Sequence, residues 1–158
     1  MLGSSLCWRY RNMHEVYGFH RDKISLSSCA VDNSLDLIHS NQLNTLFSEI
    51  KPDLVIHCAG LTSLEACERE PTLAHEANVT VTENIARAYS NETKLVYIST
   101  DQVYGKADDH SETNTDLQPL NQYGKTKLLG EKKVQEHFKN HIIVRTNIFG
   151  WNVKPGRI

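Results

Sequence analysis

The sequence DLVIHCAG, residues Asp53–Gly60, is a short continuous apolar run that ends in a turn of small residues. Two further runs of the same kind follow it, KLVYIS at Lys94–Ser99 and HIIVR at His141–Arg145. Continuous apolar runs of this length are typical of parallel strands that are buried on both faces. Longer stretches separate the three runs, so we predict that they are strands of a parallel sheet.

Helical patterns occupy the stretches between these runs, and turn signals separate the two kinds of segment. Gln42–Ile50 has apolar residues at helical spacing, and Pro52 then ends that helix. Asn121 can cap a helix that runs to about Asn140. The other predicted elements are a strand at His14–His20, helices at Leu64–Glu70 and Pro71–Ser90, and a loop at Lys106–Leu120.

This alternation of strands and helices predicts an α/β fold of the Rossmann type, a doubly wound parallel sheet with helices on both faces. Ligands of such sheets bind in the crevice beyond the carboxyl ends of the strands. We therefore expect the functional residues to come directly after the strands.

Composition and charge exclude several classes of function. The chain has 158 residues, about one domain, and its net charge of −2 argues against nucleic acid or acidic membranes as partners. No apolar run approaches a membrane span, and the N-terminus is a poor signal peptide. The four cysteines lack CxxC spacing and the eight histidines form no HExxH motif, so we expect reduced thiols, no metal site and a cytoplasmic protein.

Tyr123 and Lys127 lie four residues apart on a predicted helix, which places their side chains on one face. A nearby ammonium stabilises a phenolate and makes the phenol a better proton donor. Thr100, at the end of its strand, can hydrogen-bond the same substrate oxygen. This set suits a ketone that accepts hydride, because negative charge builds on its oxygen. Taken alone, a Tyr–Lys pair at this spacing is more often an ordinary surface pair.

A longer pattern surrounds this pair. The segments STDQVYG at Ser99–Gly105 and PLNQYGKTKLLGE at Pro119–Glu131 resemble the extended short-chain dehydrogenase/reductase family, especially its dTDP-4-dehydrorhamnose reductase group. IKPDLVIHCAG at Ile50–Gly60 resembles the fourth strand of that group. Shorter matches that agree with it are Glu68–Pro71, Asn78–Val79 and Arg145–Thr146.

The resemblance implies roles for single residues. Thr100, Tyr123 and Lys127 fall on the catalytic threonine, tyrosine and lysine of the family. The tyrosine would give a proton to the carbonyl oxygen, and the lysine would hold the nicotinamide ribose and tune the tyrosine. The implied coenzyme contacts are the turn of Cys58, Ala59 and Gly60, and Asp36 and Leu37 at the adenine. The implied sugar pocket lies near Thr62, Thr100 and Asp101.

The first residues depart from the family pattern. MLGSSL at Met1–Leu6 resembles the end of the family's G-x-x-G-x-x-G turn, with Gly3 as its third glycine and without the strand before it. We expect the family's second and fourth strands to lack their central partner here. We interpret residues 1–158 as a partial dinucleotide-binding domain without the small C-terminal sugar-binding part, weakly active or inactive alone.

The choice of coenzyme depends on the residues after the predicted strand His14–His20. Arg21 can accept a 2′-phosphate, which slightly favours NADP over NAD, whereas Asp22 can hold the ribose 2′-hydroxyl of NAD. A solvated charged loop explains the same residues equally well.

The predicted function is NAD(P)H-dependent reduction of a keto group on a nucleotide-linked sugar. One alternative is an epimerase or dehydratase of the same superfamily, although Asp101-Gln102 stands where dehydratases usually carry an acidic pair. Another is a non-catalytic dinucleotide-binding regulatory subunit, against which the intact Thr100, Tyr123 and Lys127 argue. A homodimer is one assembly that the resemblance implies. His57 and Cys58 are interpreted as a core histidine and a packing residue.

Overall fold

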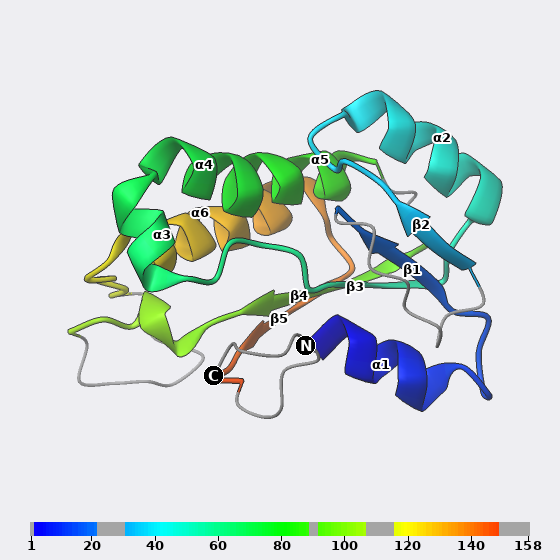
Figure 1. Cartoon of the computed structure of the whole chain (residues 1–158), viewed down its shortest axis with the longest axis horizontal. Coiled ribbons are helices and arrows are strands. Elements are labelled where there is room, and N and C mark those ends of the chain that lie inside the picture. The colour runs from blue at the N-terminus through cyan, green and yellow to red at the C-terminus, as the bar shows by residue number, and fades with distance from the viewer. Residues whose placement is uncertain (1, 22–30, 89–91, 107–115, 149–158) are drawn as a thin grey trace. The chain divides into compact units, whose positions relative to one another are not determined.

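The computed structural model describes residues 2–21, 31–88, 92–106 and 116–148 (Figure 1). The chain divides into two compact units, one of Met1–Asp36 with Ile148–Ile158 and one of Leu37–Asn147. All strand ladders among the described residues are parallel. The predicted α/β class with Rossmann-type parallel strands is therefore confirmed.

The first unit contains helix α1 at Leu2–Tyr10, strand β1 at Tyr17–His20 and strand β2 at Val31–Ser34. Strand β1 lies in the second half of the predicted segment His14–His20 and pairs with β2. We did not predict β2, because its sequence VDNS carries an aspartate and an asparagine, which are depleted in strands.

The second unit has a three-stranded sheet in the order β3-β4-β5. The three predicted apolar runs form these strands, β3 at Leu54–His57, β4 at Lys94–Ser99 and β5 at His141–Arg145. The helical elements are α2 (Ser40–Ile50), α3 (Leu64–Arg69), α4 (Pro71–His75), π-helix η1 (Glu76–Thr80), α5 (Val81–Arg87), 3-10 helix η2 (Asp101–Val103) and α6 (Gln122–His137).

The helix predicted at Pro71–Ser90 is not a single α-helix. Pro71 does begin it, but one π-helical turn, η1, separates α4 from α5. A π-helical turn accommodates an extra residue, which hydrophobic spacing does not resolve, and such turns often occur at functional sites. Figure 1 shows α4 to α5 as one run of turns.

The start of α6 agrees with the prediction. The side chain of Asn121 caps it by accepting a hydrogen bond from the Gly124 amide at 2.7 Å. The helix ends at His137, earlier than predicted, because Phe138 is already extended. Of the predicted loop Lys106–Leu120, residues 107–115 lie outside the described residues.

Helices α5 and α6 lie side by side over the sheet face that carries Leu95, Tyr97 and Ser99 (Figure 1). Gly130 lets α6 come close to this face. A Cβ atom at Gly130 would lie 2.4 Å from Tyr97 Oη and 2.8 Å from the carbonyl oxygen of Asn78. This close approach places the inner face of α6 directly on β4.

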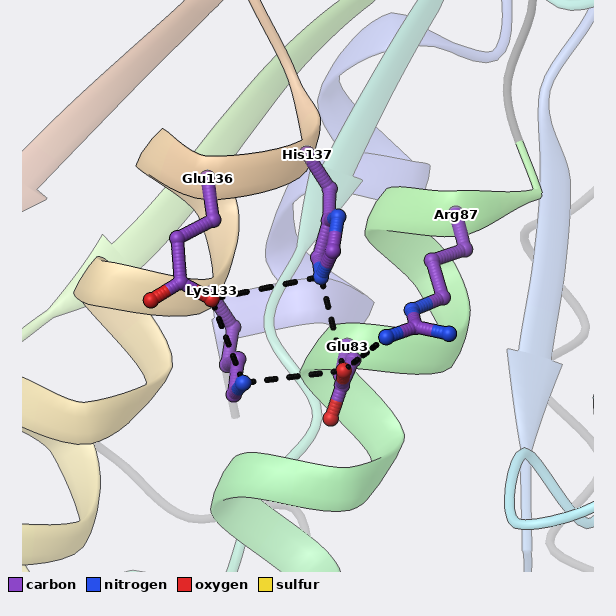
Figure 2. Close-up of polar contacts among 5 residues, drawn as sticks. All are labelled: Glu83, Arg87, Lys133, Glu136 and His137. Carbon is purple, nitrogen blue, oxygen red and sulfur yellow. Dashed lines mark hydrogen bonds and ion pairs between the residues drawn. The ribbon is translucent and has the colours of Figure 1, made fainter.

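A cluster of charges joins the outer faces of α5 and α6. Glu83 lies 2.6 Å from Arg87, 3.6 Å from Lys133 and 3.4 Å from His137 (Figure 2). Burial acts to raise the pKa of Glu83, but Lys133, Arg87 and His137 outweigh it, and that pKa is lowered. The folded state therefore favours the ionised form of Glu83.

We expect Glu83→Gln to lower the free energy of unfolding at pH 7 by less than about 1 kcal/mol, because exposed ion pairs contribute little. The difference between wild type and variant should be full above the unfolded-state pKa of Glu83 and vanish as pH falls through its lower folded-state value. Urea unfolding of both proteins at neutral and acid pH measures it. Glu49→Gln, an exposed carboxylate on α2, is the matched control, and an equal loss there would contradict the prediction.

Candidate active site

Apart from Leu37, the residues predicted for the site that belong to the second unit gather at the carboxyl ends of its strands. Cys58, Ala59, Gly60 and Thr62 follow β3, and Thr100 and Asp101 follow β4. Tyr123 and Lys127 come from α6, which packs against β4 and η2. The two segments and the helix thus meet at one edge of the parallel sheet, where ligands of such sheets bind.

Lys127 is buried at this edge, with 4% of its surface exposed. Its Nζ donates a hydrogen bond to the carbonyl oxygen of Ile98 at 2.7 Å and lies 4.1 Å from the centre of the Tyr97 ring. Burial lowers the pKa of Lys127 to about 8, while Glu131 and Cys58 act to raise it. The side chain is therefore mostly an ammonium at neutral pH, but it loses its proton far more easily than an exposed lysine.

Tyr123 is half-buried, and Thr100 is buried beside it. Burial raises the pKa of Tyr123, and a side-chain hydrogen bond with Thr100 acts to lower it. Thr100 Oγ1 also donates to Asp101 Oδ1 at 3.1 Å and accepts from the Gln102 amide at 3.3 Å. These bonds fix the threonine hydroxyl next to a protonated phenol.

Asn78 holds this edge together, a role that we did not predict. Its Oδ1 accepts from the Leu61 amide at 2.8 Å, and its Nδ2 donates to the Leu61 carbonyl at 3.1 Å and to Thr126 Oγ1 at 3.0 Å. A Cβ atom at Gly60 would lie only 2.7 Å from Asn78 Oδ1. Asn78 therefore fixes the turn after β3 to α6, at the residue next to Lys127.

His57 and Cys58 behave as predicted. His57 is 3% exposed, its Nε2 lies 2.9 Å from Thr82 Oγ1, and burial lowers its pKa to about 3. It is a neutral core histidine. Burial raises the pKa of Cys58 to about 11, so its thiol is a poor nucleophile at neutral pH.

The remaining predicted coenzyme residues are spread over both units. Gly3 lies in the first turn of α1, Arg21 directly follows β1, and Asp36 is exposed after β2, all in the first unit. Leu37 belongs to the second unit, where its carbonyl oxygen accepts from Asn84 Nδ2 at 3.2 Å. Asp22, the alternative contact for NAD, lies outside the described residues.

The pattern of a known family matches nearly the whole chain. The sequence model of the RmlD substrate binding domain matches residues 1–152. The chain belongs to this family. It is similar to dTDP-4-dehydrorhamnose reductase of Salmonella typhimurium, with 42% identity over 102 residues, 63% of this chain and 34% of that protein.

The chain is also similar to two other proteins. Methionine adenosyltransferase 2 subunit beta of Pongo abelii is 32% identical over 143 residues, 89% of this chain and 41% of that protein. The crystal structure of dTDP-4-dehydrorhamnose reductase from Bacillus anthracis in complex with NADP is 31% identical, with a TM-score of 0.67 over 79% of this chain and 47% of that chain. This chain thus spans less than half the length of all three relatives.

Candidate membrane spans and candidate metal sites are both absent from the described residues. Their helices include none with both the length and the apolar character that a membrane span requires. Nor do the side chains of His, Cys, Asp and Glu form any group of three or more that could hold a metal ion in the described part of the chain.

Proposed function

We propose that the protein reduces a keto group on a nucleotide-linked sugar with NADPH or NADH. The observation that carries this proposal is that Thr100, Tyr123 and Lys127 gather at the carboxyl end of β4, where Lys127 is a buried ammonium bonded to the Ile98 carbonyl. Similarity to dTDP-4-dehydrorhamnose reductases supports it. The activity is proposed for the whole protein that the gene encodes.

Each of the three side chains has one task in this reaction. Tyr123 donates the proton that the carbonyl oxygen takes up, and Thr100 hydrogen-bonds the same oxygen as charge develops on it. Lys127 holds the coenzyme ribose and favours the phenolate that Tyr123 becomes. The nicotinamide coenzyme supplies the hydride that goes to the carbonyl carbon.

The residues of the second unit fit such a coenzyme. Ala59 and Gly60 expose their backbone at the end of β3, where Asn78 fixes the turn. Among the described residues Lys127 makes one hydrogen bond, so its other N–H groups are available for ribose hydroxyls. The full proposed coenzyme set is Gly3, Arg21, Asp36, Leu37, Cys58, Ala59, Gly60, Tyr123 and Lys127.

We propose NADP as the preferred coenzyme, with Arg21 as the partner of the 2′-phosphate. The NADP complex of the Bacillus anthracis relative supports this choice. Thr62, Thr100 and Asp101 are the proposed contacts of the sugar. A cytoplasmic location and a homodimeric assembly complete the proposal, on the basis of the cysteine pattern and the family resemblance.

Coenzyme titration of the whole protein tests this function. Saturable binding of NADPH or NADH, followed by coenzyme fluorescence, is expected in the wild type and should be lost in Gly60→Trp, which blocks the turn after β3. Gln135→Trp, at an exposed position of α6, is the matched control and should bind normally. Turnover of a keto-sugar nucleotide panel is measured next.

Two results would count against the proposal. Failure to bind either coenzyme would overturn it. Binding without turnover of any keto sugar would favour the alternative of a non-catalytic subunit. The Pongo abelii relative is itself named as a subunit of another enzyme.

A further inference from the structure

Glu131 is a buried carboxylate that has no assigned role in the proposed reaction. It lies one helical turn beyond Lys127 on α6 and is 1% exposed. Its Oε1 accepts a hydrogen bond from Ser99 Oγ at 2.5 Å and from Arg145 Nε at 3.1 Å, and its Oε2 accepts from Arg145 Nη2 at 2.8 Å. Burying a carboxylate is costly unless it is paired, and both oxygens of Glu131 are paired here.

The partners of Glu131 hold both ends of one functional segment. Ser99 directly precedes Thr100 at the end of β4. The guanidinium of Arg145, at the end of β5, lies 5.1 Å from the centre of the Tyr104 ring, just after η2. The segment from Ser99 to Tyr104, which carries Thr100 and Asp101, is thus tied at each end to the Glu131–Arg145 pair.

The geometry therefore connects the two halves of the proposed catalytic set. Tyr123, Lys127 and Glu131 follow one another at intervals of four residues on α6. We propose that Glu131, paired with Arg145, is a positioning residue that holds Thr100 at the carboxyl end of β4 and stabilises the ammonium of Lys127 one helical turn away. This inference rests on the proposed function for its catalytic part, whereas its effect on Lys127 is measurable without turnover.

Among the described groups whose charge could act on Lys127, Glu131 is an anion near pH 7. Burial raises the pKa of Tyr97 on β4 and that of Cys58 after β3, and burial lowers the pKa of His57, so all three are neutral near pH 7. Burial likewise raises the pKa of Tyr123. Hydrogen bonds to Glu131 raise the pKa of Arg145, which stays a cation paired with the carboxylate.

Glu131→Gln separates the charge from the shape of this side chain. The amide keeps the size of glutamate and can still accept from Ser99, but it no longer opposes the effect of burial on Lys127. The pKa of Lys127, about 8 in the wild type, should fall by about one unit. The alkaline limb of kcat against pH should move toward acid by the same amount, with KM for the sugar nucleotide little changed.

The titration of Lys127 is measured directly, by NMR of the whole protein labelled with ¹³C at the lysine Cε and assigned with Lys127→Met. Glu136→Gln, on an exposed face of the same helix, is the control and should leave the titration of Lys127 unchanged. Should Glu131→Gln fail to fold, Glu131→Gln with Arg145→Gln removes both buried charges. The pKa of Lys127 should fall in that variant too, by a smaller amount.

The outcomes distinguish this inference from the proposed function. A wild type that reduces no keto sugar overturns the proposed function, whatever the titration shows. An active Glu131→Gln variant in which neither the pKa of Lys127 nor the alkaline limb moves overturns the inference and leaves the function standing. A uniform loss of kcat at every pH with an unmoved Lys127 indicates a purely structural carboxylate and also overturns it.

Discussion

Replacing Tyr123 with phenylalanine is expected to lower kcat for keto-sugar reduction by about 10²- to 10⁴-fold, the usual contribution of a positioned proton donor. The phenylalanine ring keeps the size of the half-buried tyrosine side chain but has no proton to give. Coenzyme affinity should fall far less than kcat, because the turn after β3 and Lys127 remain in place. The loss of NADPH absorbance with a keto-sugar nucleotide measures kcat, and coenzyme fluorescence measures Kd.

A second tyrosine provides the control for this experiment. Tyr17 on β1 donates its hydroxyl hydrogen bond to Glu15 at 2.6 Å, and it belongs to the first unit. Tyr17→Phe therefore removes the same atom from a residue outside the proposed catalytic set, and its kcat should equal that of the wild type. Retention of more than about a tenth of the activity in Tyr123→Phe would remove this residue from the role of proton donor.

The strands that position the site were predictable because their signal is local. The runs at β3, β4 and β5 are apolar throughout, as strands buried on both faces must be, and Asn121 marks the start of α6 by its own side chain. Strand β2 carries no such apolar run. It is a strand because it pairs with β1, and that pairing cannot be read from its own residues. The π-helical turn at Glu76–Thr80 is built from the same kinds of residue as an α-helix and shifts only the helical register. The sequence pattern therefore did not predict it.

The residues that hold the site together could not be found in the same way. Asn78 and Glu131 both lie within the motif segments that we noted, but a motif does not say what a side chain contacts. The partners of Asn78 lie 17 and 48 residues away in sequence, and those of Glu131 lie 32 and 14 residues away. Such pairings depend on how α6 packs against the sheet, and neither hydrophobic spacing nor capping residues specify that packing.

Asn78→Leu is expected to lower the free energy of unfolding by about 3 kcal/mol and to raise the Kd for the coenzyme by about tenfold. The leucine fits a site that is 1% exposed but leaves the Leu61 amide and carbonyl without their side-chain partner. An amide or carbonyl that loses its partner in a half-buried turn costs about 1–3 kcal/mol. Without Asn78 the turn at Gly60 should adopt its coenzyme-binding conformation less often. The Kd for the coenzyme should therefore rise, and kcat should change little.

A pair of variants separates stability from the function of the turn. Asn78→Asp keeps the oxygen that accepts from Leu61 but sets a buried carboxylate oxygen against the Leu61 carbonyl, so it should destabilise the protein at least as much as Asn78→Leu. Asn140→Leu removes one hydrogen bond, to the Thr93 carbonyl at 3.3 Å, at the amino end of β5. It should reduce stability and leave the Kd for NADPH unchanged, because that end of the sheet lies away from the site.

Urea unfolding and coenzyme titration of the same samples provide both quantities. An Asn78→Leu protein that is destabilised like Asn140→Leu but binds NADPH with wild-type affinity would show that Asn78 serves the fold alone.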